Sequence, residues 1–276
     1  MSRIGFGITG DLDPQVVREL APAVERAGLD TLWVNQPGRA GDALGVVAIA
    51  AEVTRTLRLA TGVLPMELFP ADGVVDRVRE LTLPTDRLVL GIGASRRPSP
   101  LTTAREAVRR IHDGLDVPVV VGALGPRMRR LGTVEADGVL LNWLTPELAR
   151  DAAEDRDRDR RAAQEQTGGT GDADGAGTSA RAGETALYVR CAIGAAAHEV
   201  TRREAEKYAS IPTYAANFAR HGYGPLTTAV LAEDGASLRE GLAGFDGTVE
   251  EVVVRAVTAT GSLAEHLELV EALAGD

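Results

Sequence analysis

Hydrophobic and polar positions alternate in blocks along this chain. Short runs such as residues 117–121 (VPVVV) and 251–257 (EVVVRAV) are apolar on both faces, as expected of parallel strands covered by helices. Amphipathic stretches lie between them, and residues 15–27 have apolar positions at helical spacing before Gly28. The predicted strands are residues 3–9, 31–34, 57–64, 88–92, 117–121, 138–143, 186–193 and 251–257. The predicted helices are residues 15–27, 42–54, 71–81, 103–112, 126–135, 146–166, 198–218, 226–233, 238–242 and 263–273.

This strict strand–helix alternation predicts the α/β class. Eight strand–helix units in 276 residues favour a single (β/α)8 TIM barrel that spans residues 1–276. A doubly wound sheet is the alternative, but the glycines of residues 5–10 (GFGITG) do not open directly into a helix. Residues 167–184 are nearly all Gly, Ala, Thr, Ser and Asp, and we interpret them as a flexible insertion between the sixth and seventh barrel strands.

Composition narrows the partners that the chain could have. A net charge of −10 disfavours nucleic acid, because binding phosphates requires a basic patch. Cys191 is the only cysteine, and no apolar stretch approaches the roughly 20 residues that span a bilayer. The first residues lack an apolar signal-peptide core. We therefore expect a cytoplasmic protein that acts on a small-molecule substrate, without membrane contact.

In a barrel of this kind the active site lies at the carboxyl ends of the strands. The fifth predicted strand is followed there by a glycine-bearing loop that leads into a helix. Pro126 suits the first helical position, and the N–H groups of Arg127 and Met128 would face an anion. An ordinary loop with a good helix start is the alternative. The candidate phosphate-binding residues are Gly122, Ala123, Leu124, Gly125, Pro126 and Arg127.

A second glycine cluster follows the fourth strand. Gly93 and Ser95 would allow close backbone approach to a ligand, and Arg96 and Arg97 could clamp an anion. A solvated loop with surface arginines is the alternative. The sequence has no paired histidines or cysteines at metal-ligand spacing and no nucleophile elbow, so we predict no metal site. Such a chain favours a cofactor that carries the chemistry.

Five segments together resemble the luciferase-like family of flavin- and deazaflavin-dependent oxidoreductases. They cover the second to sixth strands, about half of the chain, and their order and spacing carry the resemblance. The segments are residues 25–34 (ERAGLDTLWV), 57–65 (LRLATGVLP), 86–93 (DRLVLGIG), 119–131 (VVVGALGPRMRRL) and 136–147 (ADGVLLNWLTPE).

The resemblance implies an eight-stranded barrel, usually a homodimer, with the cofactor at the strand ends. It also implies a non-proline cis peptide after the third strand, here Gly62–Val63, which would back the cofactor ring. The loop from Gly122 to Arg127 would hold the cofactor phosphate. Many members carry a histidine after the second strand, where this chain has Asn35 and Gln36, and a glutamine cannot act as a general base.

Three functions are compatible with these residues. The first is hydride transfer between coenzyme F420, a deazaflavin, and a small organic substrate. The second is an FMN-dependent monooxygenase, and the third is a non-catalytic flavin-binding or dimer-partner barrel. The candidate catalytic residues are Glu67, for proton handling, and Gln36. A solvated loop glutamate is the alternative for Glu67. The candidate ring and substrate contacts are Asn35, Gln36, Val63, Glu67, Asn142 and Trp143.

Overall fold

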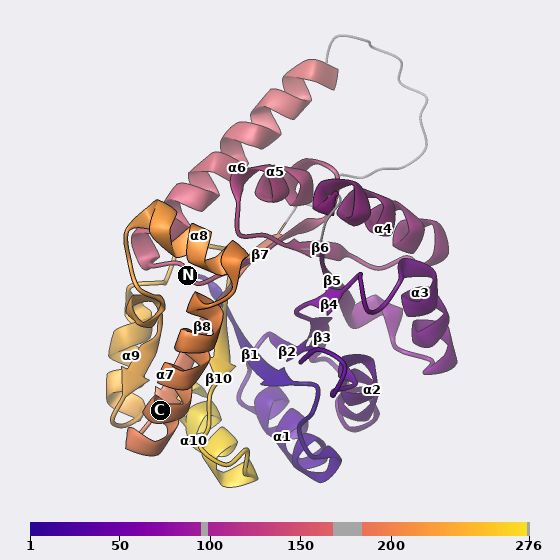
Figure 1. The fold of residues 1–276 in the computed structure, drawn as a ribbon. Helices are drawn as coiled ribbons and strands as arrows, with labels where there is room; N and C mark the ends of the chain where they lie inside the picture. Colours follow the sequence, from indigo (N-terminus) through magenta and orange to yellow (C-terminus); the bar gives the residue numbers. More distant parts are fainter. Residues whose placement is uncertain (95–98, 168–183, 275–276) are drawn as a thin grey trace.

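A computed structural model describes residues 1–94, 99–167 and 184–274. In these ranges eight parallel strands close into a barrel, because β10 pairs with both β1 and β8 (Figure 1). The barrel strands are β1 (Arg3–Thr9), β2 (Thr31–Asn35), β3 (Arg58–Thr61), β5 (Leu88–Gly93), β6 (Val119–Gly122), β7 (Gly138–Asn142), β8 (Glu184–Ile193) and β10 (Glu251–Ala256). Two short strands, β4 (Leu64–Pro65) and β9 (Val230–Ala232), pair in parallel with the carboxyl ends of β5 and β8. The predicted fold class is therefore confirmed.

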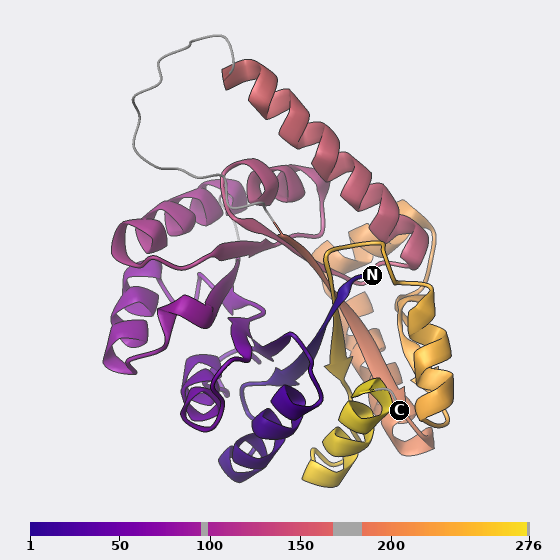
Figure 2. The same ribbon diagram turned by 180° about the vertical axis from the view of Figure 1, so that it is seen from behind.

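Helices form a ring outside the strands and bury the main apolar core against them (Figures 1 and 2). They are α1 (Pro14–Arg26), α2 (Ala43–Val53), α3 (Ala71–Glu80), α4 (Pro100–Gly114), α5 (Pro126–Val134), α6 (Pro146–Thr167), α7 (Ala195–Ala209), α8 (Pro212–His221), α9 (Gly235–Ala243) and α10 (Leu263–Ala274). The charged helix α6 extends beyond this ring in both views. None of the helices in the described ranges is long and apolar enough to cross a membrane.

Three sequence predictions need correction. The strand predicted over 57–64 is divided, because β3 ends at Thr61 and a cis peptide precedes β4. The helix predicted over 198–218 is two helices, since Ile211 before Pro212 is extended, as the proline ring requires. The helix predicted over 226–233 is a 3-10 turn, η2 (Pro225–Thr228), followed by β9. The proposed insertion at 167–184 lies almost wholly outside the described residues.

The amino-terminal end of the barrel interior is closed by charged side chains. The Arg3 and Arg58 guanidinium groups lie 2.8 and 3.0 Å from the Glu184 carboxylate, and Arg3 lies 3.5 Å from Glu251. Trp33 Nε1 donates to Glu251 Oε1 at 2.8 Å. Burial raises the pKa of Glu251, although the bond from Trp33 and the positive charge of Arg3 act in the opposite direction. Two cations and two carboxylates thus offset one another at this end.

Two helices depart from the regular pattern after β8. Glu204 of α7 bonds to Arg190, which belongs to the inward-facing row of β8, and Phe218 of α8 packs on Trp143 after β7. The following segment, β9 and α9, then resumes the outer ring (Figure 1). The excursion from α7 to α8 therefore lies over the carboxyl ends of β7 and β8.

Gly91 gives a direct test of how closely β3 and β5 are packed. A Cβ at this position would collide with the carbonyl oxygen of Thr61, which belongs to rigid strand backbone. We expect Gly91→Ala to lower the free energy of unfolding by about 2 kcal/mol or more, as overpacking of a core does.

Gly73 in α3 is the matched control, because nothing lies within 4 Å of a Cβ there. We expect Gly73→Ala to leave stability unchanged or to raise it by up to about 1 kcal/mol. Denaturant unfolding of both variants provides the measurement, and equal effects would contradict the described packing.

Candidate functional site at the carboxyl ends of the strands

The peptide between Gly62 and Val63 is cis, as the resemblance implies. A Cβ on Gly62 would collide with the Tyr188 hydroxyl, so only glycine lets the chain pass at this point. The Val63 side chain lies between Gly93 and Gly122, where added Cβ atoms would be 2.7 and 2.9 Å from its methyl groups. Four predicted cofactor residues therefore meet in one place, around a small apolar surface at the strand ends.

The loop after β6 leads into α5 as predicted, with Gly125 at the N-cap and Pro126 at the first helical position. One detail differs, because the Met128 N–H donates to the carbonyl of Gly125 and is not free. Within the described residues, the N–H groups of Leu124, Gly125 and Arg127 have no hydrogen-bond partner. Together with the positive end of the helix dipole, these groups can hold an anion.

A basic cluster from other elements adjoins the start of α5. The Arg220 guanidinium of α8 lies 3.8 Å from the position of a Cβ on Gly125. Burial and the charges of Arg129 and Arg220 lower the pKa of the neighbouring His221. Arg129 Nε, Asn217 Nδ2 and His221 Nε2 are buried nitrogens without a hydrogen-bond partner. Buried donors in excess, beside free helix N–H groups, fit an acceptor-rich anion such as a phosphate.

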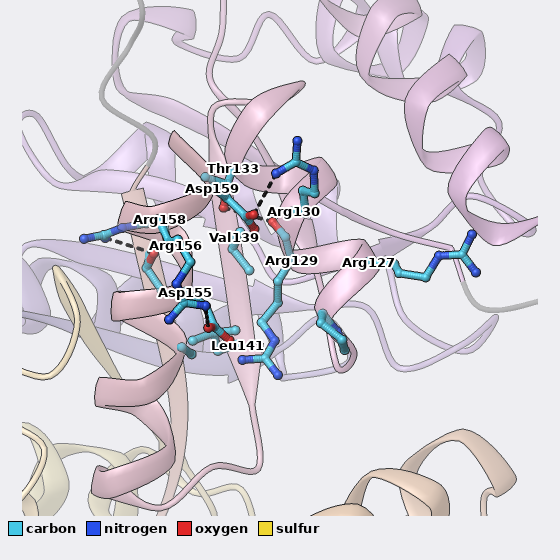
Figure 3. A pocket seen from close by; sticks show the side chains of 13 residues that line it. Arg127, Arg129, Arg130, Thr133, Val139, Leu141, Asp155, Arg156, Arg158 and Asp159 are labelled. Carbon is cyan, nitrogen blue, oxygen red and sulfur yellow. Dashed lines mark hydrogen bonds and ion pairs between the residues drawn. The ribbon is translucent and has the colours of Figure 1, made fainter. Parts of the chain in front are cut away.

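Arg127 itself is exposed, and Figure 3 shows it extended away from the neighbouring side chains. These side chains line a cavity between α5 and α6, against the outer face of β7 (Figure 3), and its volume is about 250 Å³. Its rim is paired, since Arg130 contacts Asp159 and Arg158 contacts Asp155, both at 2.7 Å. This cavity lies outside the barrel wall and shares only Pro126 and Arg127 with the predicted loop.

A buried arginine, Arg190 of β8, lies on the side of the barrel mouth formed by β7 and β8. The sequence patterns assigned it no role. Arg190 is 3% exposed, and its guanidinium lies 3.4 Å from the ring centroid of Trp143. It donates to Glu204 Oε1 at 2.9 Å and to Asn142 Oδ1 at 2.7 Å. The available signal was a single arginine at an inward position of an otherwise apolar strand.

The substrate candidates are placed differently from one another. Asn35 and Asn142 end β2 and β7 at the barrel mouth, and both are partly exposed. Trp143 is 1% exposed and enclosed by Arg190, α7 and α8, so it supports the arginine rather than lining open space. Its φ of 56° turns the chain sharply at the end of β7.

The two candidate catalytic residues also differ. Gln36 is 5% exposed, and its amide donates to the carbonyls of Gly38 and Gly41 and accepts from the Ala43 N–H. These three bonds commit Gln36 to holding the loop that leads into α2. Glu67 lies partly buried in the turn after β4. In the chain it closely follows the Gly62–Val63 cis peptide, which we call the bulge. Ser95, Arg96 and Arg97 lie outside the described residues.

Arg255 is a further mouth residue that the sequence reasoning missed. It pairs in register with Gly7, and its guanidinium bonds to the carbonyl of Ala256. Within the described ranges no ion pair to Arg255 is found, whereas Arg190 has Glu204. The strand ends therefore carry more positive than negative charge on the side of β8 and β10.

The contact between Val63 and the glycines predicts a compensating pair of mutations. Gly93→Ala should destabilise the chain by roughly 1–3 kcal/mol, because the new methyl group meets a Val63 methyl group at 2.7 Å. Val63→Ala should relieve that clash, so the double variant should be more stable than the sum of the single effects predicts. Thermal unfolding of the four proteins measures the coupling, and strict additivity would argue against this contact.

Two curated proteins are similar in sequence to about half of this chain. These relatives, from Methanolobus tindarius and Archaeoglobus fulgidus, are both described as 5,10-methylenetetrahydromethanopterin reductase. They are 24% and 26% identical over 165 and 181 residues, which are 47% and 52% of this chain. The matched regions are 51% and 54% of the relatives, so the similarity spans about half of their length. No family model matches the sequence.

Solved structures share the fold over nearly the whole chain. An F420-dependent secondary alcohol dehydrogenase, in complex with an F420–acetone adduct, has a TM-score of 0.74 at 15% identity over 100% of this chain and 99% of its own. The coenzyme F420-dependent tetrahydromethanopterin reductase from Methanopyrus kandleri has a TM-score of 0.68 at 17% identity, covering 98% and 97%. An FMN-bound Baeyer–Villiger monooxygenase component from Pseudomonas putida has 0.66 at 13% identity, covering 99% and 97%. The chain therefore shares its fold with F420- and FMN-dependent oxidoreductases, and about half of it is similar in sequence to two reductases, which is consistent with the resemblance that its own motifs carry.

Proposed function

We propose that this chain is an F420-dependent oxidoreductase that moves hydride between the deazaflavin and a small organic substrate. One structural observation carries the proposal. The cis peptide at Gly62–Val63 and the glycines Gly93 and Gly122 meet beside the anion-binding start of α5. A planar ring and a phosphate therefore have adjoining places on one end of the barrel.

The residues present fit such a cofactor. The Gly62–Val63 peptide and the partly exposed Val63 side chain, which packs between Gly93 and Gly122, would support one face of the ring. The N–H groups at Leu124, Gly125 and Arg127, with the guanidinium of Arg220, would hold the phosphate. When bound, the deazaflavin would supply or accept the hydride. The protein's part is to orient the ring and to exclude water from one of its faces.

Two predicted residues are candidates for proton transfer to or from the substrate. Glu67 is the carboxylate that follows the bulge directly in the chain, and it lies in the turn after β4. We propose it as the group that exchanges a proton with the substrate at the mouth. Gln36 has no ionisable group, and its amide is bonded to backbone at three points.

An FMN-dependent monooxygenase is the second candidate. The FMN-bound neighbour with a TM-score of 0.66 has the same fold, and the anion site suits either phosphate. F420 is favoured because both curated relatives and the two other neighbours described above bear the names of F420- or methanopterin-linked reductases and dehydrogenases. A reduced flavin reacts readily with oxygen, whereas a reduced deazaflavin does so poorly.

Titration of the purified chain with oxidised F420 and with FMN, followed by fluorescence, tests the proposal. Tight binding of F420 with little binding of FMN would support hydride transfer. The opposite preference would favour the monooxygenase. Binding of neither cofactor would reject both enzymatic functions and leave a barrel without a redox cofactor.

Removal of one positive charge, that of Arg220, tests the proposed phosphate site at the start of α5. We expect Arg220→Gln to weaken the binding of FMN or F420 by roughly tenfold, as loss of one charge-assisted contact does, and to leave riboflavin binding unchanged. Riboflavin carries the ring without the phosphate. Arg18→Gln is the control, because Arg18 pairs with Glu52 on the outer helices and should have no effect. Equal losses for FMN and riboflavin in Arg220→Gln would place Arg220 elsewhere than at the phosphate.

A further inference from the structure

The buried arginine of β8 fixes the direction in which Asn142 presents its amide. Arginine remains protonated and has only donors, so the atom of Asn142 that faces it at 2.7 Å must be the amide oxygen. The amide nitrogen then points the other way. No hydrogen bond to this nitrogen is found within the described residues, and it is not among the buried polar atoms without a partner.

The arginine is itself held on three sides. Glu204 accepts from its Nε at 2.9 Å, the Trp143 ring lies 3.4 Å from its guanidinium carbon, and the Tyr208 ring lies at 5.0 Å. Because Arg190 is 3% exposed, solvent does not compete for its donors. A guanidinium fixed in this way gives the Asn142 side chain one strongly preferred orientation.

Asn142 lies at the rim of the proposed ring site. It is the last residue of β7 and pairs in register with the inward-facing Tyr188. One step below it on the same strand face is Leu140, whose side chain contacts Gly62 of the bulge. The strand before it ends at Gly122, against Val63. Asn142, whose side-chain N–H groups have no partner within the described residues, therefore lies one step beyond the residues around Gly62–Val63, on the same inward face of the barrel.

We infer that Asn142 is a hydrogen-bond donor to the polar edge of the cofactor ring, and that Arg190 and Glu204 are its positioning residues. This inference rests on the proposed function. The acceptor on the ligand is a carbonyl oxygen or a ring nitrogen of the pyrimidine half, which flavins and deazaflavins share. Since α7 carries Glu204, the helical excursion after β8 helps to define the ring site without touching the ring.

Asn142→Asp is the sharpest test, because it keeps the size of the side chain and the acceptor for Arg190 but removes the donor. We expect the affinity for oxidised F420, FMN and riboflavin to fall by about tenfold or more, since a donor is replaced by a charged acceptor. Asn142→Leu should give a smaller loss, because it removes the donor without adding a charge. Thermal stability of Asn142→Asp should be unchanged or higher, because the new carboxylate pairs with Arg190.

A second comparison tests the positioning residues. Arg190→Met with Glu204→Leu removes both charges together, so that neither is left buried without its partner. The Asn142 amide can then turn, and we expect a loss of ring affinity of a few fold, with a change in the visible absorption spectrum of bound FMN. A purely structural role of the pair would lower stability and leave that spectrum unchanged.

The outcomes separate the inference from the proposed function. If the unmodified chain binds neither cofactor, the proposed function fails, and this inference fails with it. If it binds a cofactor and Asn142→Asp binds it equally well with the same spectrum, the proposed function stands and the donor role of Asn142 is overturned. A loss confined to phosphate-bearing ligands would also overturn it, because riboflavin reports the ring alone.

Discussion

A closed parallel barrel requires that the inward-facing side chains of eight strands fill one shared interior, and the rest of this structure depends on how they do so. At the amino-terminal end, Arg3 and Arg58 meet Glu184 and Glu251 and form a balanced charged layer. Above that layer, the inward-facing rings of Trp33 and Tyr188 meet edge to face. A chain segment passing over Tyr188 then has room only for a glycine, and this constraint places the Gly62–Val63 bulge.

The two ends of the barrel differ in how their charged side chains are paired. Each cation of the lower layer has a carboxylate within 3.0 Å, so the positive charges at this end of the barrel are paired within the protein. Near the start of α5, by contrast, the buried Arg129 Nε has no hydrogen-bond partner, and within the described residues Arg220 donates to the Asn217 amide oxygen and has no carboxylate partner. Nitrogens that are withdrawn from water and left without acceptors are costly, unless an anion completes them. The lower layer also contains buried donors without a hydrogen-bond partner, Arg3 Nε and Nη2, but carboxylates lie beside them. The difference between the two ends is therefore one of charge pairing, and it supports an anion site near the start of α5.

Sequence patterns predicted the barrel because its determinants are local and periodic. Apolar runs, helix-stop glycines and prolines at helix starts each act within a few residues of themselves. The glycine-bearing loop that opens α5 could also be located, since a short contiguous motif around Gly122 carries it, and the cis peptide at Gly62–Val63 followed from the family resemblance. The path of α7 and α8 could not be predicted in this way. A proline at residue 212 indicates a break, but only tertiary packing on Trp143 decides where the second helix goes.

The residues missed at the site share one property, which is that their roles arise from partners distant in sequence. Arg190 acquires its function from Glu204 on α7 and from Asn142 at the end of another strand. Conversely, Trp143 and Gln36 stood at strand ends, where ligand contacts are common, yet the fold uses both to hold protein atoms. Position at a strand end thus favours contact with a ligand but does not establish it. What remains after these internal bonds are assigned is a small set of groups, of which the Asn142 amide nitrogen is one whose direction the fold itself determines.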